Sequence, residues 1–143
     1  MELVVVICII AILSGIVLFG AVQYINKGKD SNISGSLAVL IPAGEVFYNG
    51  NSNSYEDFCG SVVVKNIQAQ MPPNSSGDCL SGPTPGICCD DEKESWAACA
   101  REFADLDRAY CVDSRGIKEE ICNSSCTSSL TQCPDPATQT NCS

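Results

Sequence analysis

Cysteine is the residue whose number and spacing offer the most chemistry in this chain. The sequence has eleven cysteines among 143 residues, and ten of them follow a long apolar N-terminal run. An even number of cysteines in a small acidic region is typical of a disulfide framework formed in an oxidising compartment. The disulfide candidates are Cys59, Cys79, Cys88, Cys89, Cys99, Cys111, Cys122, Cys126, Cys133 and Cys142.

Zinc binding is the competing interpretation of these cysteines. Cys122 and Cys126 are four residues apart and could share an ion, but no second pair of short spacing completes a four-cysteine site. The adjacent Cys88 and Cys89 suit two separate disulfides better than one metal ion. We therefore expect disulfides, no bound metal and no cofactor, in a pairing that the sequence does not specify.

Enzymatic chemistry has little basis in the sequence. It contains no histidine, no G-x-S-x-G motif, no glycine-rich phosphate loop and no C-x-x-C pair. Asp105 and Asp107 offer Ca²⁺ only two carboxylates, which falls well short of the roughly 6–8 oxygens that this ion takes. The formal net charge of −9 repels nucleic acid and anionic lipid headgroups. We expect a protein that is not an enzyme and has no nucleic-acid partner.

A charge-free run follows the acidic residue Glu2 and covers residues 3–25. As a helix it would be roughly 35 Å long, enough to cross the hydrocarbon core of a bilayer. It lacks the basic start and the short length of a cleaved secretory signal. Lys27 and Lys29 come after it, which predicts that the head lies in the cytoplasm. The cysteines instead predict that the head lies in an oxidising compartment. A short basic leader removed from the front of the chain would resolve this conflict.

The element that must position these groups is a long helix. Apolar residues recur at helical spacing beyond the run, and Gly28, Gly35, Gly44 and Pro42 weaken or kink the pattern. We expect one bent helix from Glu2 to about Tyr48, ended by the turn residues 49–54. The apolar stripe of its second half comprises Ile33, Leu37, Leu40, Ile41, Val46 and Phe47.

The rest of the chain is expected to be a loop, a hairpin and a tail. Residues 61–67 could form a short strand inside a long loop. Residues 94–116 read as two strands, and reflecting them about Asp105 places Cys99 opposite Cys111. One face, assigned to packing on the helix, then carries Trp96, Ala98, Ala100, Tyr110 and Val112. Cys99 and Cys111 share the other face, either bonded to each other or each tied to a different loop.

The expected fold class is therefore α+β, a long helix packed against a small antiparallel sheet in a disulfide-rich head. We divide the chain into a hydrophobic helix (1–26) and a head (27–143). The head is divided into an amphipathic half-helix (27–48), a loop (49–94), a β-hairpin (95–115) and a cysteine-stapled C-terminal region (116–143).

The N-terminal stretch MELVVVICIIAILSGIVL resembles the start of type IV pilins and related pseudopilins, and the layout of the whole chain agrees. WAACARE and YCVDSRG are also similar to the strand pair of pilin-like proteins from small-genome bacterial lineages. The resemblance implies that a membrane peptidase removes a leader and that the new N-terminus is methylated. It also implies that the helix waits in the inner membrane before assembly machinery moves it into a filament.

In that family the acidic residue is thought to neutralise the terminal amine of a neighbouring subunit, a role that falls here to Glu2. The assembly residues implied are Glu2, Leu3, Val4, Val5, Val6, Ile7, Gly15 and Gly20. Family members usually have a few more residues before the acid and often a proline midway through the first half of the helix, and this sequence shows neither feature. Gly15 and Gly20 then serve close helix packing or a melted stretch, which we predict between Ser14 and Gly20.

The resulting hypothesis is a structural subunit of an extracellular type IV pilus-like filament, located in the inner membrane before assembly and on the cell surface afterwards. Its partners would be other copies of itself, membrane lipid, the leader peptidase and the assembly machinery. The alternatives are a pseudopilin of a type II secretion system and a single-pass, cysteine-rich surface binding module that never polymerises.

Overall fold

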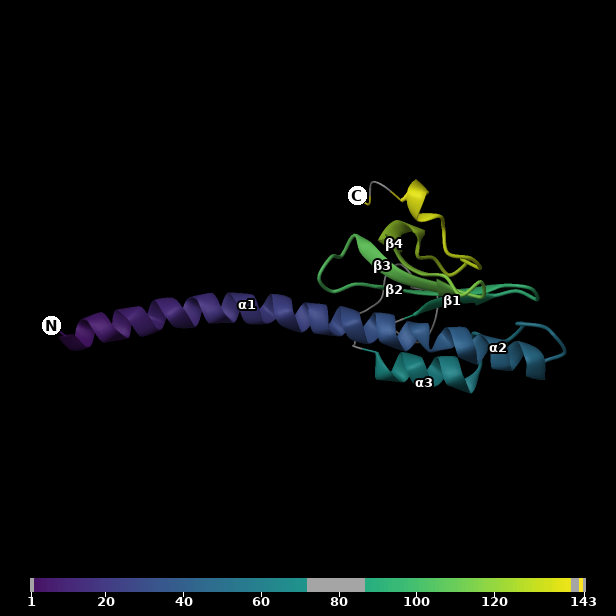
Figure 1. Cartoon of the computed structure of the whole chain (residues 1–143), viewed down its shortest axis with the longest axis horizontal. Coiled ribbons are helices and arrows are strands. Elements are labelled where there is room, and N and C mark those ends of the chain that lie inside the picture. The colour runs from purple at the N-terminus through teal and green to yellow at the C-terminus, as the bar shows by residue number, and fades with distance from the viewer. Residues whose placement is uncertain (1, 72–86, 140–141, 143) are drawn as a thin grey trace.

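The structure is a computed structural model that describes residues 2–71, 87–139 and 142. A long helix, α1 (Glu2–Ala38), extends far beyond a small head and continues into α2 (Leu40–Gly50) (Figure 1). The head adds a third helix, α3 (Val62–Gln70). Its four strands are β1 (Cys88–Asp91), β2 (Trp96–Arg101), β3 (Arg108–Asp113) and β4 (Lys118–Cys122).

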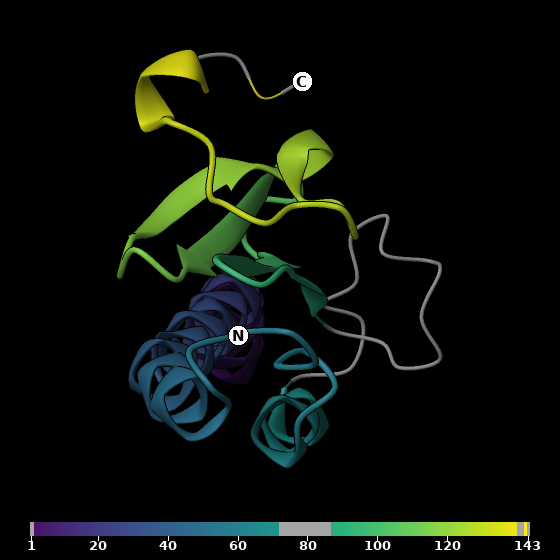
Figure 2. The ribbon, with the colours of Figure 1, turned by 90° about the vertical axis from the view of Figure 1, so that its right-hand side faces the viewer.

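The head has three layers. The strands form one antiparallel sheet in the order β1-β2-β3-β4. Figure 2 shows the helices on one face of this sheet and the segment after β4 on the other face. That last segment contains two short 3₁₀ turns, η1 (Asn123–Ser125) and η2 (Pro136–Thr138). The α+β class expected from the sequence, a long helix on a small antiparallel sheet, is confirmed.

The long helix is interrupted at Val39, which separates α1 from α2. Pro42 explains the position of this break. It has no N–H to donate to the carbonyl of Ala38, so one hydrogen bond of the helical ladder is lost there. The interruption lies near Pro42, where a kink was expected, and the helix ends at Gly50, two residues beyond the expected Tyr48.

The main core lies between the helices and the sheet. Ile33, Leu37 and Leu40 are fully buried there, as the apolar stripe predicts. Val46 is an exception, because it is 74% exposed on the outer side of α2, and its assignment to the stripe is wrong. Gly44 is needed for close packing, since a Cβ built on it would lie 2.7 Å from Nε1 of Trp96.

The predicted hairpin has the expected register. Cys99 pairs with Cys111, and the neighbouring pairs are Ala98 with Val112 and Ala100 with Tyr110. The face assigned to packing on the helix does contact the main core. The sequence interpretation missed two strands that flank this hairpin, β1 and β4, so the predicted loop 49–94 and the C-terminal region each contribute one strand to the sheet.

Residues 62–67 belong to helix α3, and the short strand considered for residues 61–67 is wrong. Three consecutive valines favour a strand by propensity, but Val64 and Ile67 are buried one helical turn apart, which gives α3 an inward face. Ser61 begins the helix, because its side-chain oxygen accepts a hydrogen bond from the N–H of Val64 at 3.4 Å.

Candidate functional site

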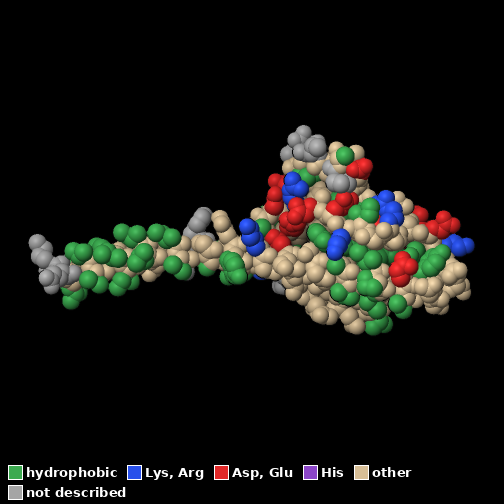
Figure 3. Space-filling view, in the orientation of Figure 1, with side chains coloured by type: hydrophobic (Ala, Val, Ile, Leu, Met, Phe, Trp, Pro, Cys, Tyr) green, Lys and Arg blue, Asp and Glu red, His purple; other side chains and the backbone are tan. Residues whose placement is uncertain are grey.

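The N-terminal part of the long helix projects away from the head (Figure 1). We call residues 3–25 the stalk. Figure 3 shows hydrophobic side chains around the visible face of this projection. The exposed large side chains are Leu3, Val4, Val5, Val6, Ile7, Ile9, Ile10, Ile12, Leu13, Ile16, Val17, Val22, Tyr24 and Ile25. The stalk is therefore apolar all round, rather than amphipathic.

The stalk could span a membrane. The helical stretch Leu3–Gly50 contains an 18-residue window with a mean hydropathy of 3.1, none of it buried. Covering one exposed leucine, isoleucine or valine is worth about 1.5–3 kcal/mol. Monomeric soluble proteins rarely leave a continuous apolar surface of this extent in water. Lipid tails or other apolar helices are the two environments that would satisfy it.

The few polar groups of the stalk are satisfied locally or left free. The hydroxyl of Ser14 donates a 2.7 Å hydrogen bond to the carbonyl of Ile10, one turn earlier. Cys8 is a free, exposed thiol. A Cβ added to Gly15 or Gly20 would meet no atom within 4 Å, so packing inside the chain does not explain either glycine.

The predicted assembly residues lie in one helical segment. The backbone of α1 is continuous from Glu2 through Gly20 in the single chain, so the melted stretch predicted for the filament stays a prediction. Met1 and the side chain of Glu2 lie outside the described residues. The proposed pairing of Glu2 with a terminal amine is therefore also still a prediction.

Disulfides hold the head together. Four join described residues: Cys59–Cys89, Cys99–Cys126, Cys111–Cys133 and Cys122–Cys142. Cys88 is disulfide-bonded as well, and Cys79 lies outside the described residues. Cys99 and Cys111 face each other across β2 and β3 but bond to separate points of the C-terminal segment. The sequence left two alternatives open, and the second one holds: Cys99 and Cys111 are each tied to a different loop.

A cluster of three cysteines has the spacing of metal ligands. The sulfur atoms of Cys88, Cys99 and Cys126 lie within 4.8 Å of one another. Cys99 and Cys126 are bonded to each other, with an S–S distance of 2.08 Å. A metal ion needs thiolates, which these sulfurs are not while the disulfide exists. The three cysteines therefore belong to the disulfide cross-links of the head.

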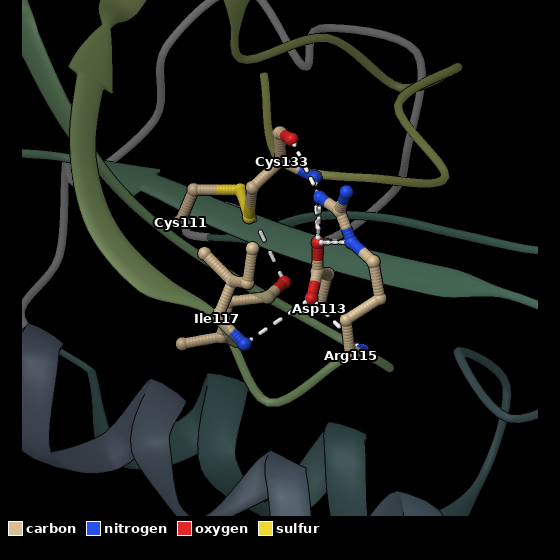
Figure 4. Close-up of polar contacts among 6 residues, drawn as sticks. Cys111, Asp113, Arg115, Ile117 and Cys133 are labelled. Carbon is tan, nitrogen blue, oxygen red and sulfur yellow. Dashed lines mark hydrogen bonds and ion pairs between the residues drawn. A yellow bond between two sulfur atoms is a disulfide. The ribbon is translucent and has the colours of Figure 1, made fainter. Parts of the chain in front are cut away.

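A buried carboxylate strengthens the attachment of the C-terminal segment (Figure 4). Asp113 is fully buried, and its oxygens accept hydrogen bonds from the backbone N–H groups of Arg115, Ile117 and Cys133. The Nε of Arg115 also donates to Asp113, at 2.9 Å, while its Nη2 donates to the carbonyl of Cys133, at 2.8 Å. Cys133 is therefore held both by these contacts and by its bond to Cys111.

A second polar connection holds the hairpin to the long helix just beyond the stalk. The carboxylate of Asp30 in α1 accepts hydrogen bonds from the backbone N–H groups of Phe103, at 2.6 Å, and Ala104, at 3.0 Å. Nζ of Lys29 lies 4.5 Å from the centroid of the Phe103 ring, in a cation–π contact. We call these contacts the Asp30 clamp. The sequence interpretation missed it, because the partners are more than 70 residues apart in the chain.

A cleft of about 430 Å³ lies beside the Asp30 clamp, between α1 and the edge of the sheet formed by β3 and β4. Figure 3 shows acidic side chains gathered where the stalk enters the head. Burial raises the pKa of Glu102 to about 7, and the nearby carboxylates of Glu120, Asp30 and Asp105 also raise it.

Comparisons of the chain with protein-family models, with curated proteins and with solved structures gave no significant match.

Proposed function

We propose that the chain is a structural subunit of an extracellular, type IV pilus-like filament, and that it polymerises through the stalk. The observation that carries the proposal is the stalk itself, a 23-residue apolar helix whose described side chains are exposed, attached to a cross-linked head. Apolar helices from several copies would cover one another's side chains in a filament core. The same surface would contact lipid tails before assembly, so the two environments remove similar apolar areas from water.

The head fits the outer part of such a filament. Its disulfides need an oxidising compartment to form and persist, which supports a head located outside the cytoplasm. Each contributes about 2–4 kcal/mol to a head that is too small for a large core. Its acidic character favours exposure to water. Glu2, at the start of the stalk, would neutralise the terminal amine of a neighbouring copy and thereby select the stagger between subunits.

The test uses the cell that makes the protein, and separates filaments sheared from its surface from the membrane fraction. The wild-type chain is expected in the sheared fraction, with a methylated N-terminus. Its unreduced intact mass should be about ten hydrogens below the reduced mass, as five disulfides require. Glu2→Ala is expected to reach the membrane but to be missing from the filaments.

Glu94→Ala is the matched control, because it removes an exposed acidic side chain of the head that makes no described hydrogen bond or ion pair. It should assemble like the wild type. Assembly of Glu2→Ala at the wild-type level would overturn the role of Glu2. Finding the wild-type chain only in membranes would favour the single-pass binding module, and finding it only in short periplasmic fibres would favour the pseudopilin.

A further inference from the structure

The junction between the stalk and the head carries more acidic groups than the cations beside them can neutralise. Arg108 pairs with two carboxylates, Asp105 at 3.7 Å and Glu120 at 3.6 Å. Glu102 takes part in no ion pair among the described residues. It follows β2 directly and lines the cleft beside Asp30.

The charged groups around Glu102 come from every element that borders the cleft. The groups that surround it are Lys27 and Asp30 of α1, Asp105 of the β2–β3 turn, Arg108 and Tyr110 of β3, and Glu120 of β4. Four carboxylates, counting Glu102 itself, thus share two cations. Lys29, the other nearby cation, lies against the ring of Phe103. An additional negative charge at this site is therefore repelled.

We propose that the Asp30 clamp is a pH-sensitive joint, in which ionisation of Glu102 weakens the docking of the β2–β3 turn on α1. Glu102 is adjacent in sequence to Phe103, whose N–H donates to Asp30. Ionised Glu102 repels Asp30, Asp105 and Glu120 together. Moving the turn away from α1 separates Glu102 from Asp30, and it breaks both hydrogen bonds of the clamp at the same time.

The direction of the effect follows from the pKa of Glu102, which rises from an ordinary value of 4.5 to about 7 in the docked state. Below about pH 4.5 the carboxyl group is neutral whether the turn is docked or released. As the pH rises towards 7, the released state ionises first, so docking weakens progressively. Above about pH 7 both states are ionised and docking stays at its weakest.

The size of the effect is bounded by the same shift. One pKa unit corresponds to about a tenfold change in the docking equilibrium. Glu102 is partly exposed, and water screens its interactions, so we expect about a tenfold effect rather than that of the full shift.

The test measures hydrogen exchange at the backbone amides of Phe103 and Ala104 in the full chain, solubilised in detergent. Rates are expressed as protection factors, which removes the intrinsic pH dependence of exchange. We expect the protection of these two amides to fall about tenfold between pH 5 and pH 8. Amides in the middle of β2 should keep theirs, which separates opening of the joint from unfolding of the head.

Two variants complete the experiment. Glu102→Gln cannot ionise and should keep the high protection of pH 5 at both pH values. Glu94→Gln makes the same change at an exposed position away from the cleft, and should behave like the wild type. Equal protection at pH 5 and pH 8 in the wild type, or an unchanged pH dependence in Glu102→Gln, would overturn the proposal. A carbon-13 titration of Glu102 with a midpoint below pH 5 would do so as well.

The joint is independent of the proposed filament. Its test needs one chain in detergent, whereas the filament test needs assembly on a cell, so either can fail without the other. If both hold, the head would attach firmly to the filament core in mildly acidic surroundings and more loosely at neutral pH.

Discussion

The two parts of helix α1 differ in the exposure of their apolar side chains. In the stalk, Leu13 is 57% exposed, although it has the same side chain as Leu37, which is completely buried 24 residues later. The stalk has no core of its own, while the second half of the helix contacts a sheet that disulfides hold in place. The comparison teaches that the helix needs two separate sources of cover. The head supplies one, and in the single chain nothing described covers the apolar side chains of the stalk.

The largest effect should come from truncating the same residue type in both halves. Leu37→Ala leaves a cavity between α1 and the sheet and is expected to lower the free energy of unfolding of the head by about 2–5 kcal/mol. Leu13→Ala should change it by less than about 0.5 kcal/mol. The fluorescence of Trp96, the single tryptophan, reports unfolding in detergent. Equal losses in both variants would mean that the stalk also packs on the head.

Cysteine substitutions offer the second test of the difference. Replacing Cys111 and Cys133 together by serine opens a cross-link between residues 22 apart, which should cost about 2–4 kcal/mol of stability. Cys8→Ser in the stalk should leave the unfolding of the head unchanged, because that thiol is free. Denaturant titrations of both variants provide the comparison. A stability loss in Cys8→Ser would contradict the separation of stalk and head.

Glycines sharpen the comparison further. Gly44→Ala forces a methyl group against the Trp96 ring and is expected to cost about 1–3 kcal/mol in the thermal unfolding of the head. Gly15→Ala adds its methyl group in open space and should leave that transition unchanged. If Gly15→Ala nevertheless blocks filament formation, close helix packing between copies would be the reason for that glycine.

The smallest effect is expected at the start of α3. Ser61→Ala removes the side-chain acceptor for the N–H of Val64 and should lower stability by about 1 kcal/mol. Ser128→Ala, an exposed serine without a described hydrogen bond, is the matched control. Urea unfolding curves resolve a difference of this size. Identical midpoints would show that the cap contributes nothing to the head.

Local pattern predicted the parts of the fold that depend on neighbours in the chain. The register of β2 and β3 follows from alternation about a short turn, and the burial of Leu37 follows from helical spacing. The helix α3 was missed because the β-branched residues at its start favour a strand, and burial of Val64 and Ile67 overrode that preference. The strand β4 was missed because its first three residues, KEE, are all charged.

Contacts distant in sequence were beyond the reach of that approach. Alternation placed Cys99 opposite Cys111, but the partner of each cysteine depends on the path of the C-terminal segment. The Asp30 clamp joins groups more than 70 residues apart and uses backbone N–H groups, which have no sequence signature. For the stalk, composition alone indicated both the helix and its exposure.

The bond between Cys59 and Cys89 has a mechanical consequence. It links the turn after α2 to β1, and so it joins the helical layer covalently to the sheet. Tension applied along the stalk while the sheet is held would first break the non-covalent contacts between α1 and the sheet. After that step the chain can be extended only as far as Cys59. Beyond this residue the force passes through the disulfide to Cys89, and the 30-residue separation between the two cysteines is not stretched. The chain between these two cysteines would therefore carry little of the load, and this bond would limit the extension of the head.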